Sequence, residues 1–89
     1  MKSIITVLGD DTVGIIARVS AFLAENNINI IDISQTTEED QFLMVMVVDM
    51  SNALISFSDA ASSLKKIGFD MGLKIHMRHK KVFDSMHRI

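Results

Sequence analysis

The segment Gly9-Asp10-Asp11-Thr12-Val13-Gly14-Ile15 carries the residues of this chain best suited to bind a small polar ligand. It lies between an apolar run typical of a strand and an amphipathic run typical of a helix. Free N–H groups at a helix start bind anions, and glycine lets a ligand approach the backbone because it has no Cβ. Aspartate carboxylates accept hydrogen bonds from an ammonium group. The segment therefore suits a ligand with both a carboxylate and an ammonium, such as an amino acid.

Structural roles compete with ligand binding at these positions. Asp11 or Thr12 could simply cap the following helix, and Gly14 could pack against the sheet. Asn29 enters a predicted strand and could orient a ligand through both ends of its amide. An asparagine leaving a helix is also a common turn residue that bonds to local backbone.

The hydrophobic pattern predicts the elements that position this loop, in the order strand, helix, strand, strand, helix, strand. The predicted strands are 3–8, 28–37, 42–50 and 73–78, and the predicted helices run from Ile15 to Asn26-Asn27 and from Ser56 to Gly72. The first and third strands are apolar on both faces, as central strands are. With right-handed crossovers, this order gives an α+β, ferredoxin-like βαββαβ fold, a four-stranded antiparallel sheet with two helices on one face.

The second face of that sheet needs a cover, because large apolar side chains left exposed usually mark an interface. The tail supplies one candidate, since Val82, Phe83, Met86 and Ile89 recur at helical spacing. A second copy of the chain supplies the other. We therefore predict a homodimer and divide the chain into one domain over 1–79 and an amphipathic tail over 80–89, which packs on its own domain or on a partner.

Composition excludes several classes of protein. The chain has 89 residues, no cysteine and a formal net charge of −2, so it offers no global attraction to nucleic acid or to anionic lipid. No apolar run approaches the roughly 20 residues of a membrane span, and no secretion signal is present. We expect a single cytoplasmic domain with no membrane or nucleic-acid partner.

Metal and catalytic chemistry have little support in the sequence. His76, His79 and His87 form no recognised zinc set, and we interpret them as solvated histidines. Asp10 and Asp11 are adjacent in a loop, and no nucleophile lies in a recognisable motif. An RNA-recognition domain has the same element order but displays aromatic residues on its central strands, where this chain has only Phe42. We predict no metal, no cofactor and no enzymatic activity.

The chain resembles ACT domains, the small-ligand regulatory modules attached to many enzymes of amino-acid metabolism. The resemblance rests on residues 11–19, followed by residues 23–30, and runs over the whole chain. The ends, residues 82–89, resemble those of the short, stand-alone ACT proteins of the uncharacterised UPF0237 group. The chain departs from the wider pattern with Val13, where many members have proline, and with Thr12, where arginine is common.

The resemblance implies a domain that pairs with another copy, often side by side in an eight-stranded sheet, with an amino acid or similar effector near the interface. The ligand-binding residues it implies are Asp10, Asp11, Thr12, Val13, Gly14, Ile15 and Asn29. We therefore expect a dimeric regulatory protein that senses an amino acid and acts on a protein partner. A dimerisation module without a ligand is the main alternative, and an RNA-binding module is a weaker one.

Overall fold

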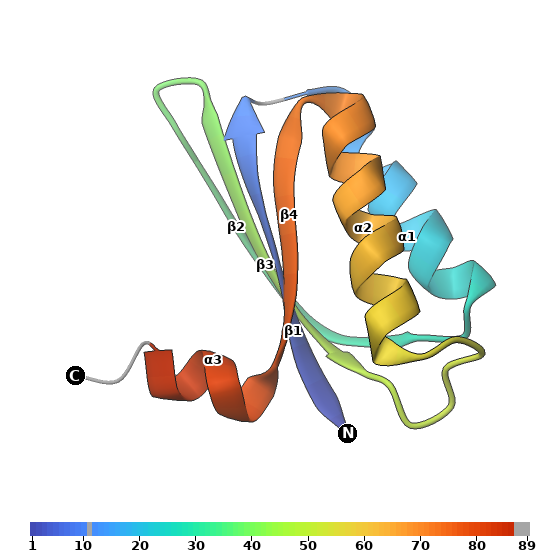
Figure 1. The fold of residues 1–89 in the computed structure, drawn as a ribbon. Helices are drawn as coiled ribbons and strands as arrows, with labels where there is room; N and C mark the ends of the chain where they lie inside the picture. The colour runs from blue at the N-terminus through green and yellow to red at the C-terminus, as the bar shows by residue number, and fades with distance from the viewer. Residues whose placement is uncertain (11, 87–89) are drawn as a thin grey trace.

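A computed structural model of the protein describes residues 1–10 and 12–86. Its first six elements follow one another in the order that the sequence predicts, and a short helix follows them (Figure 1). In chain order they are β1 (Lys2–Asp10), α1 (Ile15–Glu25), β2 (Asn29–Glu38), β3 (Gln41–Asp49), α2 (Phe57–Met71), β4 (Leu73–His79) and α3 (Lys80–Met86). The four strands form one antiparallel sheet in the order β2-β3-β1-β4. The predicted ferredoxin-like α+β fold is confirmed.

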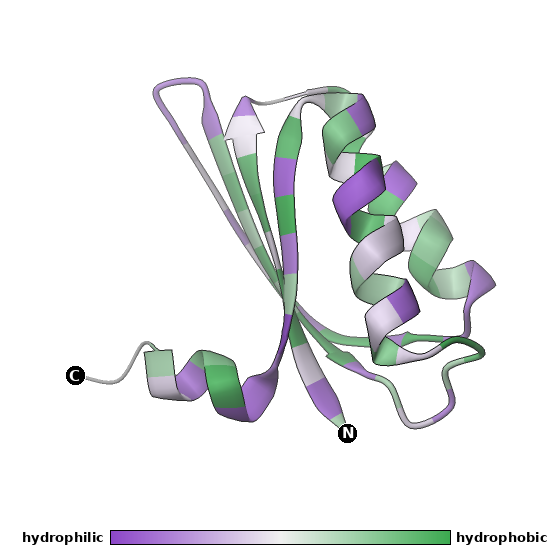
Figure 2. Ribbon diagram, in the orientation of Figure 1, coloured by the Kyte–Doolittle hydropathy of each residue, from purple (hydrophilic) through white to green (hydrophobic). Residues whose placement is uncertain are grey.

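Helices α1 and α2 both cover one face of the sheet, and their apolar stripes are directed toward it (Figures 1 and 2). The doubly apolar strands β1 and β3 lie in the centre, as predicted. Burial beneath the helices drives this packing, because each large apolar side chain removed from water contributes about 1.5–3 kcal/mol. The fully buried side chains of this core include Ile5, Val7, Val19, Leu23, Met44, Met46, Val48 and Leu64.

The ends of α2 are fixed by the residues that the sequence indicates. The Ser56 hydroxyl accepts a hydrogen bond from the Asp59 N–H at 3.0 Å, and so caps the first turn. Gly72 ends the helix in a left-handed conformation, with φ of 73°. These two residues set the length of α2 and return the chain directly into β4.

The hairpin between β2 and β3 turns at Glu39 and Asp40, which both have positive φ, at 49° and 69°. Residues 38–41, at and beside this turn, are all polar, as is typical of a hairpin turn. One detail differs: the sequence alternation places Ile31 and Ile33 on the same side of β2, but the pairing register is irregular between Ile30 and Asp32. An extra residue in a strand breaks the alternation of side chains.

The open face of the sheet, opposite α1 and α2, has an apolar centre and polar flanks. Directly paired residues share a face, so the central part of this face is made of Ile4, Thr6, Leu8, Leu43, Val45 and Val47. Lys74, His76 and Arg78 flank it on β4, and Asp32, Ser34 and Thr36 flank it on β2.

Helix α3 lies on the open side of the sheet and contacts β1 and β4 (Figure 1). Ile4 is only 3% exposed although it does not belong to the core beneath the other helices. We infer that α3 covers this end of the open face. The tail that contains α3 is one of the two covers that the sequence predicts. Leu8 and Leu43, farther along the same face, are exposed. Ile89 and His87 of the predicted tail lie outside the described residues.

No helix within residues 1–10 and 12–86 is long and apolar enough to cross a membrane. The cytoplasmic location stays a prediction of the sequence.

Gly68 gives the sharpest test of the packing between α2 and β4. A Cβ at this position would lie 2.8 Å from the carbonyl oxygen of Leu73 and 2.9 Å from Cγ1 of Ile75. We expect Gly68→Ala to lower the free energy of unfolding by about 1–3 kcal/mol, because the helix must move off the strand. Urea unfolding measures this, with Ser62→Ala on the exposed side of α2 as control. A stabilised Gly68→Ala protein would contradict the close packing.

Candidate ligand site at the start of helix α1

A cavity of about 270 Å³ lies at the start of α1, where the sequence predicts a ligand. Three predicted residues, Thr12, Gly14 and Ile15, line it, and the remaining lining residues are Ile16, Ala17 and Phe42. Sequence reasoning missed Phe42. Phe42 of β3 pairs with Gly9 of β1 and so stands beside the loop that leaves β1, a contact that no local motif of the sequence indicates.

Gly14 occupies the N-cap position of α1 with φ of 90° and ψ of 5°. This left-handed conformation favours glycine, and it lets the chain turn sharply from the loop into the helix. No atom lies within 4 Å of a Cβ built there, so the alternative that Gly14 packs against the sheet is wrong.

The first N–H groups of α1 have no intrahelical acceptor, as at any helix start. The first intrahelical bond is donated by the Arg18 N–H to the Gly14 carbonyl oxygen, at 2.9 Å. No side chain among residues 1–10 and 12–86 caps the preceding groups. The Thr12 hydroxyl donates instead to the Asp10 carbonyl oxygen at 3.0 Å, so Thr12 does not act as the cap. The start of α1 thus offers amide donors beside a cavity.

The other predicted residues of the loop lie elsewhere. The Asp10 carboxylate accepts a hydrogen bond from Gln41 Nε2 at 2.9 Å, and Asp10 lines a separate cavity of about 220 Å³ on the other side of β1. Val13 is 99% exposed and projects into solvent. Asp11 lies outside the described residues. The predicted loop therefore divides between two cavities.

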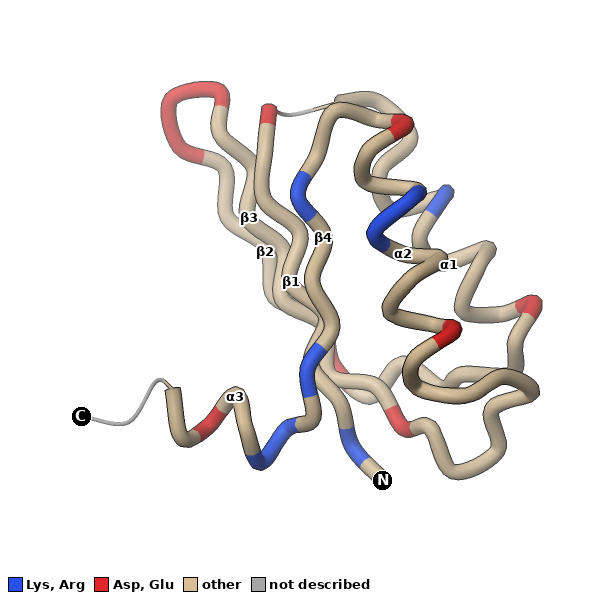
Figure 3. Tube along the Cα trace, viewed as in Figure 1, with Lys and Arg blue, Asp and Glu red and all other residues tan. Residues whose placement is uncertain are grey.

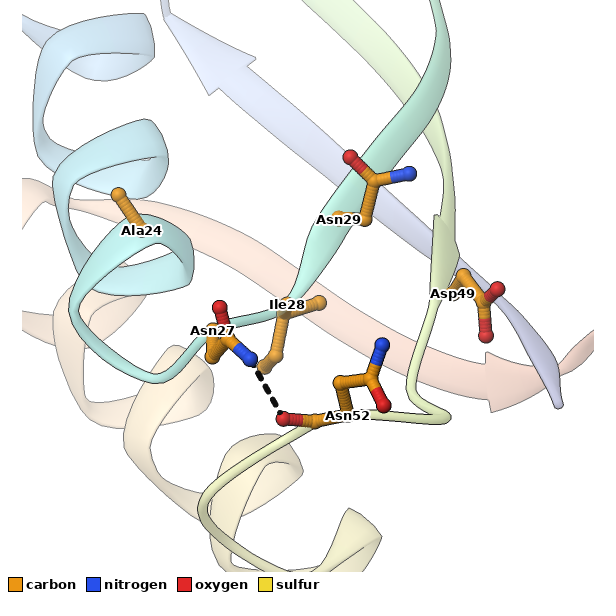
Figure 4. A pocket seen from close by; sticks show the side chains of 6 residues that line it. All are labelled: Ala24, Asn27, Ile28, Asn29, Asp49 and Asn52. Atoms are coloured by element: carbon orange, nitrogen blue, oxygen red, sulfur yellow. Dashed lines mark hydrogen bonds between the residues drawn. The ribbon is translucent and has the colours of Figure 1, made fainter.

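Asn29 lies at the far end of the sheet from the loop. It pairs with Asp49, whereas Asp10 pairs with Gln41 at the opposite end of β3. Within one chain the structure therefore does not bring Asn29 to the start of α1. Asn29 instead lines a polar cavity of about 270 Å³ with Asn27, Asn52 and Asp49 (Figure 4).

The polar groups around this second cavity are largely used by the chain itself. Asn27 Nδ2 donates to the Asn52 carbonyl oxygen at 2.9 Å, which ties the end of α1 to the loop after β3 (Figure 4). The hydroxyl and the N–H of Ser51 both donate to Asp49, at 2.6 and 2.9 Å, and the N-terminal ammonium lies 3.3 Å from it. These hydrogen bonds from Ser51, together with the ammonium, lower the pKa of Asp49 to about 2.

The histidines occupy separate positions. The ring of His79 stacks on Phe57 with centroids 4.1 Å apart, and His76 lies on the open face of the sheet. Across residues 1–10 and 12–86, no group of three or more His, Cys, Asp or Glu side chains is arranged to hold a metal ion.

Comparison with known proteins agrees with the fold. The family model of the ACT domain matches residues 3–69. The chain belongs to the ACT domain family. A UPF0237 protein of Bifidobacterium longum is 47% identical over 88 residues, which cover 99% of this chain and 98% of that protein. This ACT chain is thus also a member of the UPF0237 group.

Solved structures of known proteins agree with membership of the ACT domain family. An ACT domain protein from Streptococcus pneumoniae is 38% identical, with a TM-score of 0.81 and 98% of each chain covered. The regulatory subunit of aspartate kinase from Thermus thermophilus is 25% identical, with a TM-score of 0.66, and the match covers 86% of this chain and 50% of that one. That structure is of the ligand-free form of the subunit. The ACT family is a regulatory one, and this structural neighbour is a regulatory subunit.

The hydrogen bonds of Asp49 generate a prediction about acid stability. Because the folded protein lowers the pKa of this carboxyl from 3.8 to about 2, the ionised form stabilises the fold above about pH 4. That contribution is lost as the pH falls toward 2. We expect Asp49→Asn to be less stable than the native protein at pH 7, and the difference to shrink between about pH 4 and pH 2.

Urea unfolding at pH 7, 3 and 2 measures this difference, with Glu38→Gln at the other end of the sheet as a control for loss of one charge. A difference between Asp49→Asn and the native protein that does not change with pH would contradict the role assigned to Asp49.

Proposed function

We propose that this ACT protein is a regulatory module without enzymatic activity, which binds a small amino acid at the start of α1 and acts on a protein partner. One observation carries the proposal: the first amide groups of α1, which no side chain of residues 1–10 and 12–86 caps, stand beside a cavity lined by Phe42 and Ile15. A ligand carboxylate fits those donors, because a helix start favours negative charge. The apolar floor suits a small apolar or uncharged side chain.

We further propose that the protein acts as a homodimer through the free edge of β2. This strand pairs with β3 on one side only, and all of its residues are at least partly exposed. Ile33 on β2 and Ile16 on α1 are both exposed, which adds apolar surface along that edge. A long unprotected edge strand is a template for pairing with another chain.

Antiparallel pairing of β2 with its copy explains where Asn29 acts. The pairing places the beginning of one β2 beside the end of the other. The end of β2 pairs with Gln41, which in turn pairs with Asp10, so it lies at the same end of the sheet as the loop that enters α1. Asn29 of the partner subunit would then join Thr12 and Gly14 around one ligand. The dimer would complete the site that a single chain leaves divided.

The alternative functions fit this structure less well. An RNA-recognition surface needs aromatic side chains on the open face of the sheet, but Phe42 is buried on the helix face. The open face at β1 and β3 carries aliphatic residues instead. A dimerisation module without a ligand would not need a cavity beside the start of a helix.

Filling the cavity tests the ligand site. Ala17 lines it from the first turn of α1, and Ala21 lies one turn farther along the same helix outside it. We expect one or more of the twenty amino acids to raise the melting temperature, since a ligand at 100 times its Kd stabilises by about 2.7 kcal/mol. Ala17→Leu should abolish that shift, and Ala21→Leu should keep it.

Ala17→Leu is preferable to a change at Gly14, because a β-branched residue at φ of 90° strains the backbone by about 1–3 kcal/mol. The absence of a shift with any amino acid, or an equal shift in Ala17→Leu, would refute the proposed site.

The proposed dimer has its own test. Ile33→Lys places a charge on the exposed edge of β2, and Leu54→Lys places the same charge on an exposed residue of the loop between β3 and α2. Sedimentation should show a dimer for the native protein and for Leu54→Lys, and a monomer for Ile33→Lys, because two buried charges would face each other across the two-fold axis. A native monomer at micromolar concentration would rule out the dimer.

A further inference from the structure

The second edge of the sheet, formed by β4, has a different character from the edge formed by β2. β4 pairs with β1 on one side only, so its outer backbone groups face away from the sheet. A groove of about 380 Å³ runs between this edge and α2. It is lined by Lys65 and Phe69 of α2 and by Leu73, Lys74, Ile75 and His76 of β4.

Phe69 is the most unusual residue of this groove, because its side chain is 85% exposed. The close approach of α2 to β4 at Gly68 places the neighbouring Phe69 at the rim of the groove. Leu73 and Ile75 form the apolar wall on β4. An exposed aromatic residue beside an apolar wall is typical of a surface that receives another apolar group.

The charged side chains around the groove are all basic. Lys65 and Lys74 approach it from α2 and from β4, and blue segments of both elements face each other in Figure 3. His76 lines it as well, and Arg78 follows on the same face of β4. No carboxylate is among the residues that line it. This groove therefore suits an acidic ligand.

We propose that the groove binds an extended, acidic segment of another protein, which adds as a fifth strand to the free edge of β4. An added strand places alternate side chains on opposite faces. Those on the helix face meet Phe69 and Leu73, and those on the open face lie beside Lys74, His76 and Arg78. The segment therefore alternates apolar and acidic residues.

A second copy of this chain is a poorer occupant than a different protein. The candidate strand is β2, which is the other free edge of the sheet. Pairing of β2 with β4 would be heterologous and would extend into an open filament instead of closing. The basic side chains of β4 also oppose pairing with β4 of another copy, because like charges directly opposite each other are destabilising.

This groove would be the surface through which the proposed regulatory module contacts its protein partner, and only this regulatory role rests on the proposed function. The experiment contains no amino-acid effector, so its failure and the failure of the ligand site at α1 are distinguishable.

The probe is a fluorescein-labelled peptide of seven residues, the length of β4, with the sequence Val-Glu-Val-Glu-Val-Glu-Val. Fluorescence anisotropy with the full chain should show saturable binding. We expect Phe69→Ala and Lys65→Glu each to weaken binding about tenfold or more. Lys66→Glu, next to Lys65 but outside the groove lining, should weaken it less than about threefold.

Two modified peptides separate strand addition from simple charge attraction. A peptide with lysine in place of glutamate should not bind. Peptides N-methylated at alternate residues come in two forms, one methylated at the odd-numbered positions and one at the even-numbered positions. One of the two should also fail to bind, because it loses the N–H groups that pair with β4. Amide shifts should appear in residues 73–79.

Absence of saturable binding by the probe would overturn the proposal. Equal binding of both N-methylated peptides would do the same, because it would exclude backbone pairing. Complete displacement of the probe by millimolar inorganic phosphate would assign the groove to a small anion and would also reject a peptide site.

Discussion

Burial of the β1 and β3 side chains beneath α1 and α2 is the interaction on which the rest of the structure depends. The central strands β1 and β3 pair with a neighbouring strand on both sides. Because α1 and α2 both pack on one face, the two edges of the sheet and most of its other face are left uncovered. Backbone groups inside the sheet are paired, and those at its periphery are not. The proposed ligand site, the β2 edge and the β4 groove all use backbone groups of this unpaired kind.

The fold was predictable because local signals agree with one another. The doubly apolar strands indicated the centre of the sheet, and Ser56 and Gly72 marked the ends of α2 through capping chemistry that acts within a few residues. The irregular register at Ile30 and Asp32 was not predictable, since a bulge depends on how β2 fits β3 and not on its own alternation.

The ligand site was predictable only in part, for a different physical reason. Gly14 and Thr12 line the cavity because they are close in sequence to the helix start. Phe42 joins them through strand pairing, which a linear motif does not contain. Asn29 fits the family pattern by sequence position, but the length of β2 separates it from the loop within one chain. In the proposed dimer Asn29 would reach the ligand only through symmetry, which the sequence of one subunit does not encode directly.

The two edges of the sheet differ in what they can pair with. β2 offers the exposed residues Ile31 and Ile33 in its first half and suits a copy of itself about a two-fold axis, which closes the assembly. β4 carries Lys74 and Arg78 on one face, which oppose self-pairing and favour an acidic strand. One edge is therefore suited to building the dimer, and the other to contact with a different protein.

The ligand cavity and the β4 groove are connected by a short structural path. Gly9, at the end of β1, pairs with Leu73, and a Cβ on Gly9 would come within 2.6 Å of the Leu73 side chain. The Arg18–Asp70 contact between α1 and α2 is 3.9 Å long and exposed, so it contributes at most about 1 kcal/mol. A tenfold change in partner affinity requires about 1.4 kcal/mol. The proposed regulation would therefore act through the packed contact of Gly9 with Leu73 or through the proposed dimer, and not through this ion pair alone, because a ligand shifts an equilibrium only by its different affinity for two arrangements.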